Sequence, residues 1–295
     1  MKINNSLIEE VLAIKIDEII DCDNLALSYQ DIPNMLSFMD SEKFVQQMLD
    51  NKNVKALFIT EKLAHFFENT EIKKIICDDP RYYFYTLKNY LGKLNYKKTD
   101  SIIDPTAIIH PRAYVCEYNV KIGKNVIIEP NVSILADVII GDDCIIRANT
   151  VVGAEGFEHK RTSKGILSIF HTGKVIIGNK VEIGANNAIS KGFLFGDTLI
   201  GDETRTDNLV HIAHSAQIGK RCFLPACAMI AGDSRIGDDC WIGPNASISS
   251  QVKIGDKAFI TIGAVVTRNV EEKQTVTGNF AIEHSKFINF IKSIR

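Results

Sequence analysis

Two histidines stand close together in the segment TDNLVHIAHSAQIG, residues 206–219. A histidine is the natural general base near neutral pH, because its imidazole gains and loses a proton in that range. A zinc site would instead need three histidines that meet, and His211 and His214 have no evident third partner in the sequence. By pattern alone a single histidine is more often structural than catalytic, so the elements that carry the pair must decide between the two roles.

A period of six residues organises the chain beyond residue 100. Shorter aliphatic series with this spacing run from Ile122 to Val152 and from Ile177 to Ile189. Six is a multiple of the strand period of two residues and not of the helix period of 3.6, so the repeat predicts strands. In the longest series only Thr206 is neither isoleucine nor leucine: Ile200, Thr206, Ile212, Ile218, Leu224, Ile230, Ile236, Ile242, Ile248, Ile254 and Ile260.

The same period predicts a parallel β-helix. Three strands joined by turns would form one triangular coil of 18 residues, with the aliphatic residues in inner columns. Glycine often follows the aliphatic residue, with Asp, Asn or Lys next, which is typical of turns. About eight coils at about 4.8 Å each would make a prism about 40 Å tall. One and two coils after His214 the chain has Gly232 and Ser250, so small residues continue this column.

The hexad pattern also divides the chain into domains. Residues 1–98 lack it and alternate strand-like with helix-like segments, which predicts a small α/β domain. We expect the β-helix over residues 99–278 and a short basic amphipathic helix over residues 279–295. The repeat is interrupted at 154–174, where we expect a protruding loop, and at 191–197. Long excursions from a regular solenoid tend to be functional.

Composition and charge exclude several classes of protein. The chain of 295 residues is 45% hydrophobic and 24% charged, as in ordinary globular proteins. A net charge of −2 argues against a binder of nucleic acid or of membrane surfaces. No apolar run approaches the roughly 20 residues that span a bilayer. The seven scattered cysteines read as reduced, buried thiols of a cytoplasmic protein, and the start of the chain is too acidic for a signal peptide.

The hexads resemble those of the bacterial hexapeptide-repeat acyltransferases. That resemblance implies a mainly β protein, a left-handed β-helix and a homotrimer. Residues 150–157 (TVVGAEGF), 173–186 (GKVIIGNKVEIGAN) and 206–219 are similar to the family of UDP-3-O-acylglucosamine N-acyltransferases of lipid A synthesis. Residues 36–44 (LSFMDSEKF) and 78–87 (DDPRYYFYTL) look like the uridine-binding domain of that family.

The resemblance implies roles for residues of the β-helix. His214 matches the catalytic base, which removes a proton from the sugar ammonium before the amine attacks a thioester. Asp207 and Asn208 match residues that position the base and the sugar. Gln251 stands where the family has a second histidine that helps to hold the oxyanion, and glutamine can still donate a hydrogen bond there.

Binding residues are implied in the same way. Gly232 and Ser250 would leave a groove for the pantetheine arm of the acyl donor. Phe38 matches an aromatic residue of the uridine platform, whereas Ser41 and Phe44 stand where the family has asparagine and tyrosine. Stacking on a pyrimidine survives a change from tyrosine to phenylalanine, but hydrogen-bond specificity for uracil is expected to weaken. Both phenylalanines would serve equally well as ordinary core of a small domain.

We therefore expect a bacterial, cytoplasmic N-acyltransferase. It would move an acyl group from acyl-CoA, or from acyl-carrier protein, to the amine of a UDP- or dTDP-linked amino sugar for surface polysaccharide such as O-antigen. No tightly bound cofactor and no metal are implied. One alternative is the N-acyltransferase of lipid A and lipopolysaccharide synthesis itself, which would acylate UDP-3-O-(3-hydroxyacyl)glucosamine from acyl-carrier protein. Others are a non-catalytic hexapeptide scaffold, which Gln251 would mark, and a γ-type carbonic anhydrase, which would need a third histidine.

Overall fold

The computed structural model describes residues 2–193, 196–278 and 281–294. Parts of the 191–197 interruption and of the predicted 279–295 segment, including Arg295, lie outside the described residues. The chain divides into two compact units. The α/β unit comprises residues 1–97, 157–172 and 193–195, and the prism unit comprises residues 98–156, 173–192 and 196–295.

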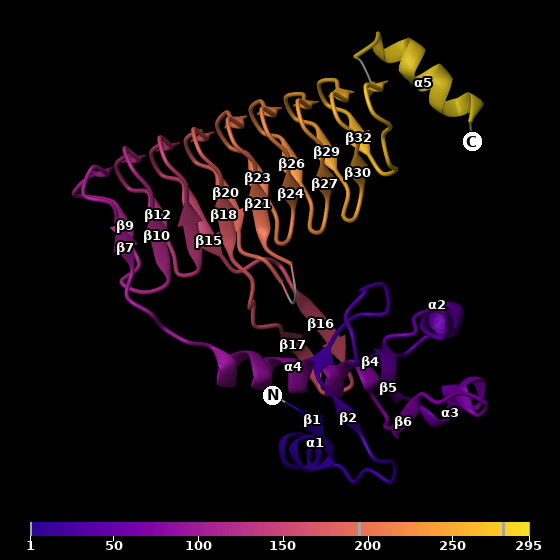
Figure 1. Ribbon diagram of the computed structural model, residues 1–295. Helices are drawn as coiled ribbons and strands as arrows, with labels where there is room; N and C mark the ends of the chain where they lie inside the picture. The colour runs from indigo at the N-terminus through magenta and orange to yellow at the C-terminus, as the bar shows by residue number, and fades with distance from the viewer. Residues whose placement is uncertain (1, 194–195, 279–280, 295) are drawn as a thin grey trace. The chain divides into compact units, whose positions relative to one another are not determined.

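The prism unit consists of three parallel sheets that form three flat faces (Figure 1). The first face contains β7 (Ile102–Ile103), β10 (Val120–Ile122), β13 (Val138–Ile140), β18 (Val175–Ile177), β21 (Thr198–Ile200), β24 (Gln217–Ile218), β27 (Arg235–Ile236) and β30 (Lys253–Ile254). The second contains β8 (Ile108–Ile109), β11 (Ile127–Ile128), β14 (Ile145–Ile146), β19 (Glu182–Ile183), β22 (Arg205–Thr206), β25 (Phe223–Leu224), β28 (Trp241–Ile242), β31 (Phe259–Ile260) and β33 (Thr275–Val276). The third contains β9 (Tyr114–Val115), β12 (Ser133–Ile134), β15 (Val151–Ala154), β20 (Ala188–Ser190), β23 (His211–Ile212), β26 (Met229–Ile230), β29 (Ser247–Ile248) and β32 (Val265–Val266).

Successive strands along the chain visit the first, second and third faces in turn, and each coil pairs in parallel with the next. In the regular part of the prism the register advances by one coil, so that Ile212 lies opposite Ile230 and Ile230 opposite Ile248. All three side chains are fully buried in one hydrophobic core. The predicted inner columns are therefore confirmed, and the residue before each inner aliphatic lies on the outside.

Thr206, the exception in the aliphatic series, is part of a buried hydrogen-bond network. Its hydroxyl oxygen accepts from the Gly184 amide at 3.0 Å and from the Asn187 side chain at 3.3 Å. The Asn187 amide group also donates to the Gly184 carbonyl at 2.6 Å, and the backbone N–H of Asn187 donates to Thr150 Oγ1 at 3.1 Å. Threonine stands at this aliphatic position because its hydroxyl oxygen is an acceptor for buried N–H groups of Gly184 and Asn187, and buried polar groups need partners.

The corners of the prism hold residues in the left-handed backbone region. Asn125, Asp143 and Asp239 have φ of 54°, 58° and 59°, and Asn and Asp tolerate this region better than most residues. Carboxylates also tie neighbouring coils together. Asp238 Oδ1 accepts from the Lys220 amide at 2.8 Å, and Asp256 Oδ1 accepts from the Asp238 amide at 2.8 Å.

The α/β unit is built on a parallel sheet with the strand order β3 (Asn24–Leu25), β4 (Met35–Met39), β5 (Val54–Ile59) and β6 (Lys73–Ile76). Its sides carry α1 (Asn5–Leu12), α2 (Val45–Asp50), α3 (Glu61–Ala64) and α4 (Pro80–Asn95), with two 3-10 turns at Glu42–Phe44 and His65–Phe67, and β1 (Ile3–Asn4) pairs with β2 (Asp21–Cys22). Alternate residues of β5 enter two separate cores, Phe58 in one and Leu57 with Ile59 in the other. Both faces of the sheet are therefore covered, as is usual for parallel sheets.

The first interruption of the prism is not a protruding loop. It forms a hairpin of β16 (His159–Thr162) and β17 (Gly165–Ser168) that belongs to the α/β unit. Asn89 of α4 donates to the Ser168 carbonyl and accepts from the Phe170 amide, each at 2.8 Å. Ile169 is 2% exposed in the core that contains Phe58. Hydrophobic burial therefore explains the length of this excursion.

The C-terminal helix α5 (His284–Ser293) has no buried residue. Its phenylalanines Phe287 and Phe290 are 47% and 56% exposed. Within the described part of the chain, no helix is long and apolar enough to span a membrane.

Candidate functional site

His214 lies in the turn between β23 and β24, at the corner where the third face meets the first. Its side chain is half-buried, and its imidazole lies against Gly232 in the next coil. A Cβ atom built on Gly232 would lie 2.5 Å from Cε1 and 2.7 Å from Nε2 of the ring. The space that the sequence suggested above Gly232 is thus filled by the imidazole of His214.

Both interruptions of the repeat leave the prism at this corner. One lies between β15 and β18 and the other between β20 and β21, in the coils that precede His214. The backbones of the two segments approach each other closely at Gly173, Gly192 and Gly196. A Cβ on Gly173 would lie 2.5 Å from the Gly196 carbonyl oxygen, so there is no room for a side chain. The histidine therefore occupies the first regular coil after the irregular ones.

Gln251 and Ser250 lie at the same corner, two coils beyond His214. Gln251 is exposed, has φ of 64° and donates its backbone N–H to the Gly232 carbonyl at 3.1 Å. Two coils correspond to about 9.6 Å along the prism. Because the His214 ring leans onto the intermediate coil, about one coil rise separates it from the turn that carries Gln251.

Asp207 and Asn208 lie at a different corner, between β22 and β23, where the second face meets the third. Both are exposed. Asn208 Oδ1 accepts from the Ala185 amide at 2.8 Å, and Asp207 Oδ1 accepts from the Asn208 amide at 2.7 Å. Within one chain the third face thus separates these residues from His214, and the hydrogen bonds of Asn208 have a clear role in the turn.

The two phenylalanines expected to bind a nucleotide pack against different cores of the α/β unit. Phe38 is half-buried at β4, with ring centroids 5.0 Å from Phe84 and 5.6 Å from Tyr85. Phe44 packs against the other core of the α/β unit, and Ser41 precedes the 3-10 turn that Phe44 ends. The two phenylalanines therefore serve different cores of the same sheet.

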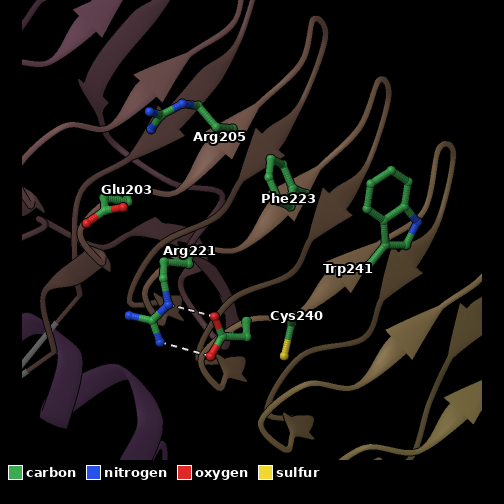
Figure 2. Close-up of a pocket in the computed structure, with 7 residues that line it drawn as sticks. Glu203, Arg205, Arg221, Phe223, Cys240 and Trp241 are labelled. Atoms are coloured by element: carbon green, nitrogen blue, oxygen red, sulfur yellow. Dashed lines mark hydrogen bonds and ion pairs between the residues drawn. The ribbon is translucent and has the colours of Figure 1, made fainter.

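An open groove of about 450 Å³ on the second face was not identified from the sequence (Figure 2). Phe223 and Trp241 lie along one side, with ring centroids 6.1 Å apart, and Phe259 continues the row 5.8 Å from Trp241. A spacing of 18 residues from Arg205 along the outward positions would have revealed this column. The groove is lined by Glu203, Arg205, Arg221, Phe223, Asp239, Cys240 and Trp241.

Two charged side chains of this groove, Arg221 and Asp239, form an ion pair. Arg221 donates to both carboxylate oxygens of Asp239, at 2.6 and 2.9 Å (Figure 2). Their hydrogen bond raises the pKa of Arg221 and lowers the pKa of Asp239. The groove therefore presents aromatic rings beside a neutralised ion pair.

Within residues 2–193, 196–278 and 281–294, no group of three or more His, Cys, Asp or Glu side chains could hold a metal ion. His211 is exposed at the start of β23, on the outside of the third face. Five of the seven cysteines are buried, as expected, whereas Cys227 is exposed and Cys77 is half-buried.

Comparison with known proteins gives the class of this fold. The family model described as bacterial transferase hexapeptide (six repeats) matches residues 119–154 and 233–268. A UDP-N-acetylglucosamine acyltransferase from Campylobacter jejuni has a similar structure, with a TM-score of 0.52 and 24% identity over 66% of this chain and 81% of that chain. The prism is therefore a left-handed β-helix of hexapeptide repeats, as the resemblance implied.

Two similar curated sequences are UDP-3-O-acylglucosamine N-acyltransferases. UDP-3-O-acylglucosamine N-acyltransferase 1 of Francisella tularensis subsp. holarctica is 37% identical over 115 residues, 38% of this chain and 33% of that protein. UDP-3-O-acylglucosamine N-acyltransferase of Rickettsia bellii is 54% identical over 82 residues, 28% of this chain and 23% of that protein. The matched segments thus span a third or less of these relatives. They confirm the resemblance to this family that the sequence motifs indicated.

Proposed function

We propose that the protein is an N-acyltransferase that acts on a UDP-3-O-acylglucosamine. The observation that carries the proposal is the half-buried imidazole of His214, seated on Gly232 at the corner where both interruptions leave the prism. The names of the similar sequences favour this acceptor over the broader group of UDP- and dTDP-linked amino sugars. The two hypotheses share the reaction and differ in the acceptor.

In the proposed reaction His214 removes a proton from the sugar ammonium. The free amine then attacks the carbonyl carbon of a pantetheine thioester, and a C–N bond forms. In this proposal a side-chain amide N–H of Gln251 stabilises the negative charge that develops on the carbonyl oxygen. Gln251 lies at the same corner as His214, two coils further along the prism. The C–S bond then breaks, and the leaving thiolate takes the proton from His214. The nitrogen of the new amide releases its remaining excess proton to solvent.

The donor's pantetheine arm would follow the same corner past Gln251 and Ser250. Since the ring of His214 already covers Gly232, the arm would approach from the C-terminal side of that coil. Lys286 and Lys292 of α5 are the lysines that could face an acidic carrier protein, which is a small platform for electrostatic recognition. The α/β unit would hold the nucleotide, with Phe38, Ser41 and Phe44 as candidate contacts.

Asp207 and Asn208 can take part only if a second copy brings them to His214. A contact between the second–third corner of one copy and the third–first corner of the next is heterologous, and such contacts form a closed ring when the rotation between copies closes. The third face supports this assembly, because Tyr114 and Val265 are 53% and 73% exposed there. We propose a homotrimer, and a monomeric mass by sedimentation at micromolar concentration would contradict it.

A thiol-release assay with mass spectrometry of the product tests the function. We expect thiol release to require an amine acceptor, and kcat/KM to be at least about tenfold higher with UDP-3-O-acylglucosamine than with UDP- or dTDP-amino sugars that lack the 3-O-acyl group. A preference for one of the latter would establish the broader hypothesis instead. No thiol release with any amine would leave the hexapeptide scaffold as the function.

The same assay compares donors on one acceptor. A preference of about a hundredfold or more in kcat/KM for acyl-carrier protein over acyl-CoA corresponds to about 2.7 kcal/mol of transition-state binding, and it would identify the carrier protein as the donor. Comparable values would identify free acyl-CoA as a sufficient donor, with no essential contact from α5.

A further inference from the structure

A chain of buried polar groups runs along the third–first corner towards His214, and the reaction described above does not use it. At its start, Lys191 Nζ lies 3.2 Å from Asp137 Oδ2, and both side chains are 8% exposed. The residue before Lys191 is Ser190, whose carbonyl oxygen accepts a hydrogen bond from Thr198 Oγ1 at 2.7 Å. Thr198 is fully buried. The ion pair and the threonine therefore enclose the base of the second interruption.

Thr198 also contacts the turn that carries His214. The backbone N–H of Ser215 donates to Thr198 Oγ1 at 2.9 Å, and the Ser215 hydroxyl donates to the Gly196 carbonyl at 3.3 Å. Ser215 has φ of 57° and is 4% exposed. Because a side chain in this backbone region is unfavourable, the turn depends on hydrogen bonds that hold it.

This contact replaces a regular feature of the prism. In the next two coils the corresponding amides donate to backbone carbonyls, Asp233 to His214 at 3.1 Å and Gln251 to Gly232 at 3.1 Å. Ser215 occupies the same turn position one coil earlier, where the interruption has displaced the regular corner. At this coil alone of the three, a threonine hydroxyl accepts the hydrogen bond of the left-handed turn residue.

We propose that Thr198 is a positioning residue for His214. Its hydroxyl holds Ser215, and Ser215 fixes the direction in which the neighbouring imidazole leaves the turn. The buried pair of Lys191 and Asp137 anchors the other side of the same hydroxyl through Ser190. The kinetic part of this inference rests on the proposed function, whereas the structural part does not.

The prism offers a matched control in Thr204. Its hydroxyl donates to the Gly219 carbonyl at 2.8 Å and accepts from the Cys222 amide at 3.1 Å. It is also fully buried. Thr204 lies at the first–second corner. Thr204→Val therefore removes one donated and one accepted hydrogen bond, as Thr198→Val does, without touching the turn of His214.

In the transfer assay we expect Thr198→Val to lower kcat by at least about tenfold relative to Thr204→Val, with KM for both substrates within about threefold of wild type. Thr198→Ser keeps the hydroxyl and should restore kcat. Equal kcat values for Thr198→Val and Thr204→Val would overturn the inference. Should Thr198→Val fail to fold, Thr198→Ala removes the hydroxyl without introducing a methyl group in its place and is compared with Thr204→Ala.

A second readout does not depend on activity. Diethyl pyrocarbonate modifies imidazoles, and peptide mapping measures the rate at His214 beside that at His211, which is exposed on β23. Thr198→Val should change the rate at His214 several-fold while His211 stays unchanged, and Thr204→Val should change neither. Unchanged modification of His214 would overturn the inference even if the protein proves to be an acyltransferase. A changed rate would support it even if His214→Ala retains full turnover and the proposed function is wrong.

Discussion

The imidazole of His214 lies directly on the α-carbon of Gly232, one coil further along the prism. A Cβ at Gly232 would meet three ring atoms, at 2.5, 2.7 and 3.1 Å, and real side chains do not approach so closely. The backbone of Gly232 is outside the left-handed region, so the turn itself does not demand glycine. The absence of a side chain at this position serves the histidine.

Gly232→Ala should therefore displace the ring of His214 and lower kcat. A displacement of about 1 Å at a reacting group costs on the order of a hundredfold, so we expect kcat to fall by about ten- to a hundredfold with a small change in melting temperature. The matched control is Gly92→Ala in α4, where a Cβ would meet Thr172 Cγ2 at 2.9 Å. If Gly232→Ala retains the kcat of the control, Gly232 does not position the base.

Thr206→Ile would make the hexad series regular, yet it should destabilise the prism. The substitution removes the oxygen that accepts from the Gly184 amide at 3.0 Å and from the Asn187 side chain at 3.3 Å. The Gly184 amide keeps its hydrogen bond to the carbonyl of residue 206 at 3.1 Å, so we expect a loss of about 0.5–1.5 kcal/mol for each side-chain hydrogen bond removed. Urea unfolding can be followed by the fluorescence of Trp241, the single tryptophan of the chain. Thr206→Ser keeps the oxygen and should lose less stability; a gain in stability for Thr206→Ile would show that the network contributes nothing.

Ile169→Ala should weaken the α/β unit although residue 169 lies within the interruption of the prism. Ile169 is 2% exposed in that unit's core, and a buried isoleucine-to-alanine change costs about 2–5 kcal/mol. Hydrogen exchange by mass spectrometry should become faster in β4 and β5 and stay unchanged in β25 to β31. Exposed Ile166, 74% accessible in β17, is the control position. Unchanged exchange in β4 and β5 would mean that the hairpin adds nothing to the core.

Alkaline pH should destabilise the protein through its buried thiols. Burial raises the pKa of Cys144 from 9.0 to about 11 and that of Cys22 to about 12. The protonated thiols contribute stability that is complete below pH 9 and is lost as the pH rises through these folded-state values, because the unfolded chain releases its protons first. The loss of melting temperature between pH 8.5 and 11 should be smaller in Cys144→Ala than in Cys227→Ala, at an exposed position. Equal losses would contradict the raised pKa of Cys144.

The regular part of the fold could be predicted from the sequence because the hexad fixes which side chain points inward at every strand. Ile212, Ile230 and Ile248 lie in one column for that reason. The sequence pattern could not explain the exception Thr206, since its partner Asn187 lies 19 residues earlier in the chain. The hairpin at 159–168 was also missed, because its contacts with Asn89 join residues about 80 positions apart and carry no local periodicity.

The site was predicted unevenly. The 18-residue coil correctly placed His214, Gly232 and Ser250 at one corner, because register in a solenoid is simple arithmetic. The same arithmetic puts Asp207 at another corner, and only a second copy could bring it to His214. Phe38 and Phe44 were grouped because both match the uridine platform of the resembled family. Phe38 lies on β4 and packs against one core, whereas Phe44 ends the 3-10 turn after that strand and packs against the other. No sequence pattern pointed to Thr198, since its contact with Ser215 depends on how the interruption at 191–197 displaces the regular corner.

The most direct test of the central claim is the turnover of His214→Ala with an acyl thioester and a UDP-3-O-acylglucosamine. Loss of a general base should lower kcat by about 10²–10⁴-fold, while the melting temperature and the mass of the assembly stay those of the wild type, because His214 is half-buried and outside the packed columns. His211→Ala, on the outside of β23, should retain wild-type turnover. Near-wild-type turnover of His214→Ala would contradict the account and direct attention to His211.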